Sequence, residues 1–131
     1  MVLGVDLDQK GWCEVAKKYF WTTGPISSSL GLDHITVDLL NNTSTTRSAT
    51  IKVYDLSDGA PILMYTKDVN IQAFSSVSKR ITASESTIWE VQVITSSRRV
   101  YIWVGGRDDA GMNLIGNVVL SSEFQLLYRE C

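Results

Sequence analysis

The sequence is poor in the residues on which many catalytic and redox sites depend. It contains one histidine, His34, and two cysteines, Cys13 and Cys131, in 131 residues. A Cys–His catalytic pair would have to use that single imidazole, and the cysteine spacing matches no metal or redox motif such as CxxC. We therefore expect two unpaired thiols, with a disulfide between the termini as the alternative if the chain ends meet.

Recognisable catalytic motifs are also missing. The sequence has no GxSxG, HExxH, P-loop or dinucleotide fingerprint. Glu85, Glu90 and Glu123 could supply an acid/base pair only if the fold brought two of them together. We expect the protein not to be an enzyme.

Neither sign of charge is in large excess, and long apolar runs are lacking. Twelve Lys and Arg residues face fourteen Asp and Glu residues, for a net charge of -2, so nothing is suited to follow a phosphate backbone. The start, MVLGVDLDQKG, does not have the basic and then apolar pattern of a secretory signal, and no run approaches the roughly 18 apolar residues of a membrane span. We expect no nucleic-acid partner, no membrane insertion and no signal peptide, and the compartment stays open.

What the sequence does contain is β-branched residues in alternating patterns. It has 13 Val, 10 Ile and 11 Thr, a composition typical of strands. In HITVDLL, ATIKVYDL and WEVQVIT, apolar residues alternate with polar ones, which predicts strands with one buried and one solvent-facing side. The predicted inward residues include Ile35, Val37, Leu39, Ile51, Val53, Trp89, Val91 and Val93.

Turn signals separate these strands at intervals of eight to fifteen residues. They are NNTSTT, SDGAP, ASES, SSRR and GGRDDAG. Because no helix-length amphipathic segment is available to connect parallel strands, the pattern favours an all-β, antiparallel two-sheet sandwich of seven to nine strands. Its predicted core contains Ile35, Val37, Ile51, Val53, Val91, Val93, Ile102, Val104, Leu120 and Phe124.

The first 32 residues do not share this regular pattern. The stretch GWCEVAKKYFW, residues 11–21, fits a helix and a strand equally well, and the following TTGPISSSLGLD is rich in Gly, Ser and Pro. We therefore expect residues 1–32 to form an N-terminal arm that packs on the domain or on a neighbour, and residues 33–131 to form the sandwich.

Residues 33–128 resemble a known class of module. The segments ITVDLLNN, TIKVYDLSDG, IWEVQV and VYIWVGG follow an order similar to that of the immunoglobulin-like β-sandwich modules of bacterial surface proteins, including CARDB-type domains. The resemblance implies an immunoglobulin-like fold and a non-catalytic structural or interaction role, although a fold alone does not assign function. No cysteine lies where antibody-type domains carry their inter-sheet disulfide.

The stretch VYIWV, residues 100–104, is apolar on both faces of its predicted strand. With Val100, Ile102 and Val104 facing the core, Tyr101 and Trp103 face outward, near Tyr54 or Trp89 depending on strand register. The alternative is that the two aromatic residues face inward or are covered by the arm. An exposed aromatic patch is typical of a protein interface or a ligand platform.

The next residues, GGRDDAG, predict a hairpin or a long loop. Gly105 and Gly106 allow positive φ, and Asp108 or Asp109 can cap a turn. The alternative is a calcium site with oxygen ligands from Asp108, Asp109 and Asn113, which the positive charge of Arg107 opposes. No other cofactor is expected.

Two other polar features are weaker. Asp6 with Asp8, and Asp55 with Asp58, form carboxylate pairs like the one in the hairpin. The run Asn41–Ser44 holds two overlapping glycosylation sequons and also fits a simple turn.

Together these features predict a structural or protein-interaction module that self-associates. Four tryptophans, a hydrophobic content of 44% and edge strands with few prolines favour a homo-oligomer. Its interface is expected to use Tyr101, Trp103, Tyr54 and Arg107, or the N-terminal arm. The alternative is a carbohydrate-binding module that uses Tyr101 and Trp103 as a platform.

Overall fold

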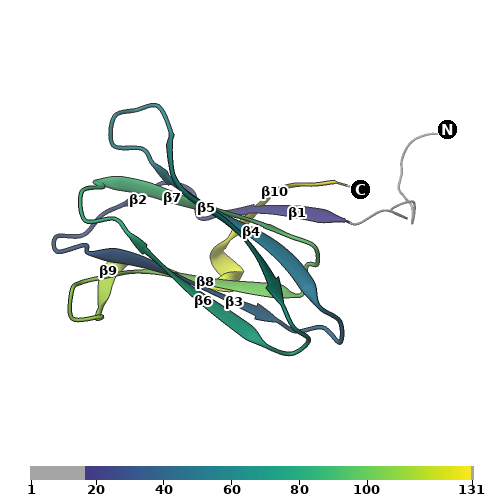
Figure 1. The fold of residues 1–131 in the computed structure, drawn as a ribbon. Helices are drawn as coiled ribbons and strands as arrows, with labels where there is room; N and C mark the ends of the chain where they lie inside the picture. Colours follow the sequence, from purple (N-terminus) through teal and green to yellow (C-terminus); the bar gives the residue numbers. More distant parts are fainter. Residues whose placement is uncertain (1–16, 131) are drawn as a thin grey trace.

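The computed structural model describes residues 17–130, which form an all-β molecule (Figure 1). The elements are β1 (Lys18–Thr22), β2 (Ile26–Ser27), β3 (His34–Asn41), β4 (Arg47–Asp55), β5 (Ile62–Ile71), β6 (Ser76–Thr82), β7 (Ile88–Thr95), β8 (Val100–Arg107), β9 (Asn113–Val119), the 3-10 turn η1 (Ser121–Glu123) and β10 (Gln125–Glu130). The predicted all-β class is confirmed. Within this part of the chain, no helix has the length and hydropathy needed to cross a membrane.

The strands form two facing layers, visible as an upper and a lower sheet in Figure 1. The six-stranded sheet has the order β10-β1-β7-β4-β5, with β2 also paired to β7, and the four-stranded sheet has the order β6-β3-β8-β9. Every pairing is antiparallel. The predicted two-sheet sandwich is confirmed. Its ten strands exceed the expected seven to nine because the first 32 residues contribute β1 and β2.

Instead of lying on the sandwich as an arm, the described part of the first 32 residues is built into it. β1 lies between β7 and β10, with Tyr19 opposite Thr95 and only 6% exposed. Of the two alternatives for residues 11–21, the strand is the one found at Lys18–Thr22. Residues 1–16 and Cys131 lie outside the described residues, and with them Cys13, Asp6 and Asp8.

A buried asparagine joins the segment after β2 to the four-stranded sheet. Asn117 of β9 is 1% exposed, accepts a hydrogen bond from the Ser29 backbone N–H at 3.0 Å and donates one to the Ser27 carbonyl at 2.9 Å. Because buried amides are costly to leave unpaired, these two bonds hold the segment in place. A region that composition marks as irregular is thereby held against β9.

The core lies between the two sheets, where the alternating apolar rows of β3, β4, β7 and β8 meet. Each such side chain contributes about 1.5–3 kcal/mol when it is fully buried, so these rows supply much of the driving force for folding. Nine of the ten predicted core residues are buried, namely Ile35, Val37, Ile51, Val53, Val91, Val93, Ile102, Val104 and Phe124.

The tenth predicted core residue, Leu120, was wrongly placed, because it is 50% exposed. The sequence VVLSSEFQLLY reads as one strand, but β9 ends at Val119 and the turn η1 intervenes before β10. A helical turn does not keep the two-residue alternation of a strand. Val119 and Phe124 therefore face the core, at 7% exposure each, while Leu120 faces outward.

The first asparagine of the two sequons is fully buried and acts as a clamp between loops. The Asn41 side-chain amide donates to the carbonyls of Thr45, Ile71 and Gln72 at 2.9, 2.8 and 3.2 Å. Its oxygen accepts bonds from the backbone N–H and the hydroxyl of Thr43 at 3.0 and 2.7 Å. Asn41 thus connects the β3–β4 turn to the end of β5 and stabilises that turn. Because its side chain is buried, its amide is not accessible for glycosylation.

We predict that Asn41→Ala lowers the free energy of unfolding by about 2–4 kcal/mol, because buried carbonyls lose their donor. Chemical denaturation measures this loss. The matched control is Asn42→Ala, whose half-buried side chain makes no hydrogen bond within residues 17–130, and which should change stability by less than about 0.5 kcal/mol. Equal effects of the two substitutions would contradict the clamp.

Candidate functional site

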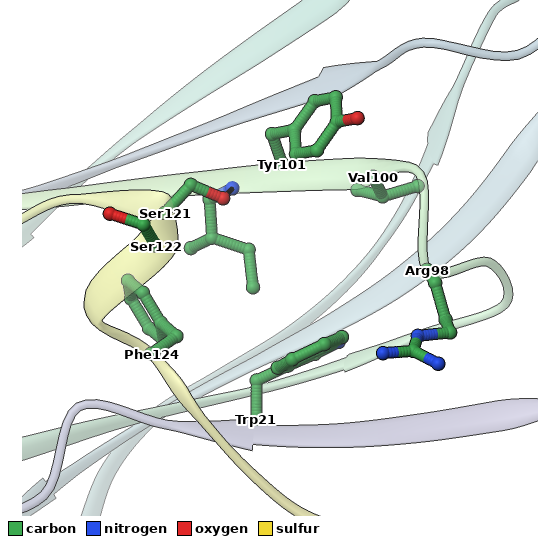
Figure 2. A pocket seen from close by; sticks show the side chains of 8 residues that line it. Trp21, Arg98, Val100, Tyr101, Ser121, Ser122 and Phe124 are labelled. Carbon is green, nitrogen blue, oxygen red and sulfur yellow. Dashed lines mark hydrogen bonds between the residues drawn. The ribbon is translucent and has the colours of Figure 1, made fainter.

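Strand β8 presents one buried and one outward face, as its sequence predicts. Val100, Ile102 and Val104 are 2%, 3% and 0% exposed, whereas Tyr101 is 42% exposed and Trp103 is half-buried. Figure 2 shows the Tyr101 ring on the opposite side of β8 from Trp21, which belongs to the six-stranded sheet. The outward placement of the two aromatic side chains is therefore confirmed.

Apolar side chains of the neighbouring strands extend this outward face. Leu40 of β3 lies directly opposite Tyr101 and is 45% exposed. Leu120 follows Val119, which pairs with Val104, so strand alternation places Leu120 on the side of Trp103. Directly opposed residues have Cβ atoms about 4.5–5.5 Å apart. We call the set Leu40, Tyr101, Trp103 and Leu120 the outer apolar patch.

The Trp103 ring is held between its own strand and an arginine. A Cβ atom added at Gly105 would lie only 2.9 Å from Cζ3 and 3.0 Å from Cζ2 of the indole, so the ring covers this glycine. The guanidinium carbon of Arg107 lies over the ring at 5.1 Å from its centroid, a cation–π contact. The indole is therefore fixed in orientation and only partly available to a partner.

The two glycines of GGRDDAG serve close packing, and the expectation that they supply positive φ is wrong. Both lie inside β8, and positive φ occurs later, at Gly111 with +82°. A Cβ atom at Gly106 would lie 2.9 Å from Cβ of Asn117 and 3.0 Å from Cδ1 of Leu32. The backbone here needs glycine because the neighbouring side chains approach it closely.

The predicted hairpin joins β8 to β9 and uses two of the three candidate calcium ligands. The Asp108 carboxylate accepts hydrogen bonds from the backbone N–H groups of Ala110 and Met112 at 3.0 and 2.9 Å. The Asn113 side-chain oxygen accepts one from Nε of Arg107 at 2.8 Å. Within residues 17–130, no group of three or more His, Cys, Asp or Glu side chains is placed to hold a metal ion. Turn formation thus accounts for Asp108 and Asn113.

The remaining predicted aromatic neighbours lie elsewhere. Tyr54 is on β4 opposite Glu90 of β7, on the outer face of the six-stranded sheet. Trp89 is fully buried in the core. Because neither residue is on the outer face of the four-stranded sheet, neither extends the patch, and the expected proximity was wrong.

The three glutamates considered as an acid/base pair are placed in separate parts of the fold. Glu90 lies on the outer face of β7 and accepts a bond from the Thr22 hydroxyl, Glu123 in η1 accepts one from the Leu120 backbone N–H, and Glu85 is in the β6–β7 turn. The three carboxylates thus lie in three different elements of the fold.

One carboxylate has a shifted pKa, but its role is to anchor a turn. Hydrogen bonds from the side chain and backbone of Ser57, and from the Ser86 hydroxyl, lower the pKa of Asp55 below its ordinary value. A lowered pKa means that the folded state favours the charged form. This contribution to stability is present above the unfolded-state pKa and is lost as the pH falls through the folded-state pKa.

Sequence reasoning missed two members of the patch, Leu40 and Leu120. In HITVDLL, Leu40 has the parity of Thr36 and Asp38, so its outward position could have been found from the alternation. Leu120 was given the wrong face because VVLSSEFQLLY was treated as one strand, whereas η1 interrupts the alternation between Leu120 and Phe124.

We predict that Gly105→Ala destabilises the protein by about 1–3 kcal/mol, since the added methyl group must displace the Trp103 ring. Thermal and chemical unfolding measure the loss. In a Trp103→Ala background the same substitution should cost much less, because the space is already empty. An equal cost in both backgrounds would show that the ring does not cover Gly105.

Comparison with known proteins gives one similar solved structure. No family model matches the sequence, and no curated protein matches it. The crystal structure of Thermotoga maritima 1070 superposes with a TM-score of 0.44 at 14% identity, covering 88% of this chain and 95% of that chain.

Proposed function

We propose that the protein is a non-catalytic interaction module that self-associates through the outer apolar patch of its four-stranded sheet. The observation that carries the proposal is a row of exposed apolar side chains across neighbouring strands: Leu40, Tyr101 and Leu120 are 45%, 42% and 50% exposed. Single exposed apolar residues are ordinary, but a contiguous group on one sheet face is typical of an interface.

Charges beside the patch favour a second copy of the same chain as the partner. Asp38 lies opposite Trp103 in the β3–β8 pairing, and Arg107 stacks over that ring. In a two-fold interface the same patch meets itself, so the acidic side chain of one copy can face the basic side chain of the other. A surface that carries both positive and negative charges beside an apolar centre is suited to that arrangement.

The module is, in this proposal, of the immunoglobulin-like CARDB type that its strand pattern resembles. Supporting this are the two antiparallel layers and the position of the patch on one exposed sheet face. A role in presenting surfaces, rather than in catalysis, agrees with the separate placement of Glu85, Glu90 and Glu123.

The carbohydrate-binding alternative has weaker support. A sugar platform needs an open ring face with free polar groups beside it. The Trp103 ring is covered by Gly105 and Arg107, while Asp108 and Asn113 are already engaged within the hairpin. Of the two aromatic residues of the patch, Tyr101 is the one with an exposed ring.

We predict that the wild-type protein associates in a concentration-dependent manner, measured by sedimentation velocity, and that Tyr101→Lys raises the dissociation constant at least about thirtyfold, as loss of an interface hot spot does. The matched control is Leu127→Lys on edge strand β10, because Leu127 is also half-exposed, at 50%. It should leave association unchanged.

Two results would contradict this proposal. One is a monomer at every concentration, and the other is dissociation by Leu127→Lys but not by Tyr101→Lys, which would move the interface to the sheet edge. A saturable fluorescence change with a polysaccharide, abolished by Trp103→Ala, would favour the carbohydrate-binding alternative.

A further inference from the structure

Apart from the outer apolar patch, the structure has a pocket between the two sheets, on the inner side of β8 (Figure 2). It has a volume of about 300 Å³. It arises because β9 ends at Val119, so the first residues of β8 have no strand beside them on that edge, and η1 crosses the gap toward the other sheet. The pocket is thus a consequence of chain topology.

The walls of the pocket are mostly apolar, with Ser121 and Ser122 as polar members, and come from three separate segments. Trp21 of β1 projects from the six-stranded sheet toward β8, and Phe124 closes one side (Figure 2). Val100 and Ile102 of β8 also line the pocket. Apolar cavities half this size stay dry and bind small hydrocarbons such as benzene. The volume is at the lower end of the range of about 300–1,000 Å³ seen for ligand sites, which favours a short ligand.

Hydrogen bonds hold the pocket open in advance of any ligand. Nε1 of Trp21 donates to the Thr95 hydroxyl at 3.1 Å, and that hydroxyl donates to the Ser97 carbonyl at 2.9 Å. On the opposite side, the Ile102 backbone N–H donates to Oγ of Ser121 at 3.2 Å. The same hydrogen bonds fix the Trp21 ring and the β7–β8 turn. Binding a ligand therefore costs little additional side-chain and loop entropy.

The mouth of the pocket carries a positive charge. Arg98 is in the turn that Ser97 anchors, and in Figure 2 its guanidinium extends from that turn toward Trp21. Among the side chains described, those of residues 17–129, the ion pairs all involve Asp33, so none of their carboxylates pairs with Arg98. Arginine pairs with carboxylates through two parallel hydrogen bonds, which makes it suited to recognise an acid head group.

We propose that this pocket binds a small amphipathic carboxylate, a medium-chain fatty acid in chemical terms. Its hydrocarbon part lies among Trp21, Ile102 and Phe124, and its carboxylate pairs with Arg98. Tyr101 borders both sites, with its ring on the opposite side of β8 from Trp21, whereas Leu40 and Leu120 of the outer apolar patch do not line the pocket.

The test compares octanoate with octanol by isothermal titration calorimetry. The wild-type protein should bind both saturably, with octanoate the tighter of the two. Arg98→Gln should weaken octanoate binding about tenfold and leave octanol binding unchanged, because only the acid uses the charge. The matched control is Arg99→Gln, an exposed arginine in the same turn that does not line the pocket, which should change neither affinity.

A second variant tests the apolar part. Ile102→Phe places extra volume in the pocket and should weaken both ligands at least about tenfold, with folding checked by circular dichroism. Leu40→Lys changes the outer apolar patch at a residue that does not line the pocket, and it should bind octanoate like the wild type, so loss of association and loss of the ligand site remain distinguishable. Absence of saturable octanoate binding, or an equal effect of Arg98→Gln and Arg99→Gln, would overturn the proposal.

Discussion

The arrangement of this molecule depends on one crossing of the chain between its two sheets, at Ser121–Glu123. Two hydrogen bonds define it: the Ile102 backbone N–H donates to the Ser121 hydroxyl, and the Leu120 N–H donates to the Glu123 carboxylate. Phe124 then enters the core and fixes the direction in which the chain leaves. The crossing gives β10 to the six-stranded sheet, leaves Leu120 on the outer face and leaves the start of β8 without a strand on its β9 edge.

Because of this crossing, the two faces of β8 have different surroundings. On the outer face, Tyr101 lies beside Leu40 and is exposed, which supports an association surface. On the inner face, Val100 and Ile102 form a wall of the pocket with Trp21 across from them. One strand of eight residues therefore contributes to both proposed sites.

The features that depend on local alternation could be predicted from the sequence. A period of two places successive side chains on opposite faces whatever the partner strand, so the inward rows of β3, β4, β7 and β8 and the outward position of Tyr101 followed directly. Features that depend on contacts between distant segments could not be predicted. Short strands such as β1 pair with β7 and β10, far away in the chain, and the pocket combines residues near positions 21, 100 and 122. The Gly105–Gly106 pair resembled a turn because nothing in the sequence orients the Trp103 ring over it.

The central claim is that Ser121 takes the place of a strand partner for the first part of β8, and amide hydrogen exchange at Ile102, followed by NMR, tests it most directly. In the wild type, the Ile102 amide should be protected like that of Val104, which lies where β9 is paired. In Ser121→Ala, exchange at Ile102 should accelerate at least about tenfold while Val104 stays protected. Rapid exchange at Ile102 in the wild type, or no change in the variant, would contradict the account.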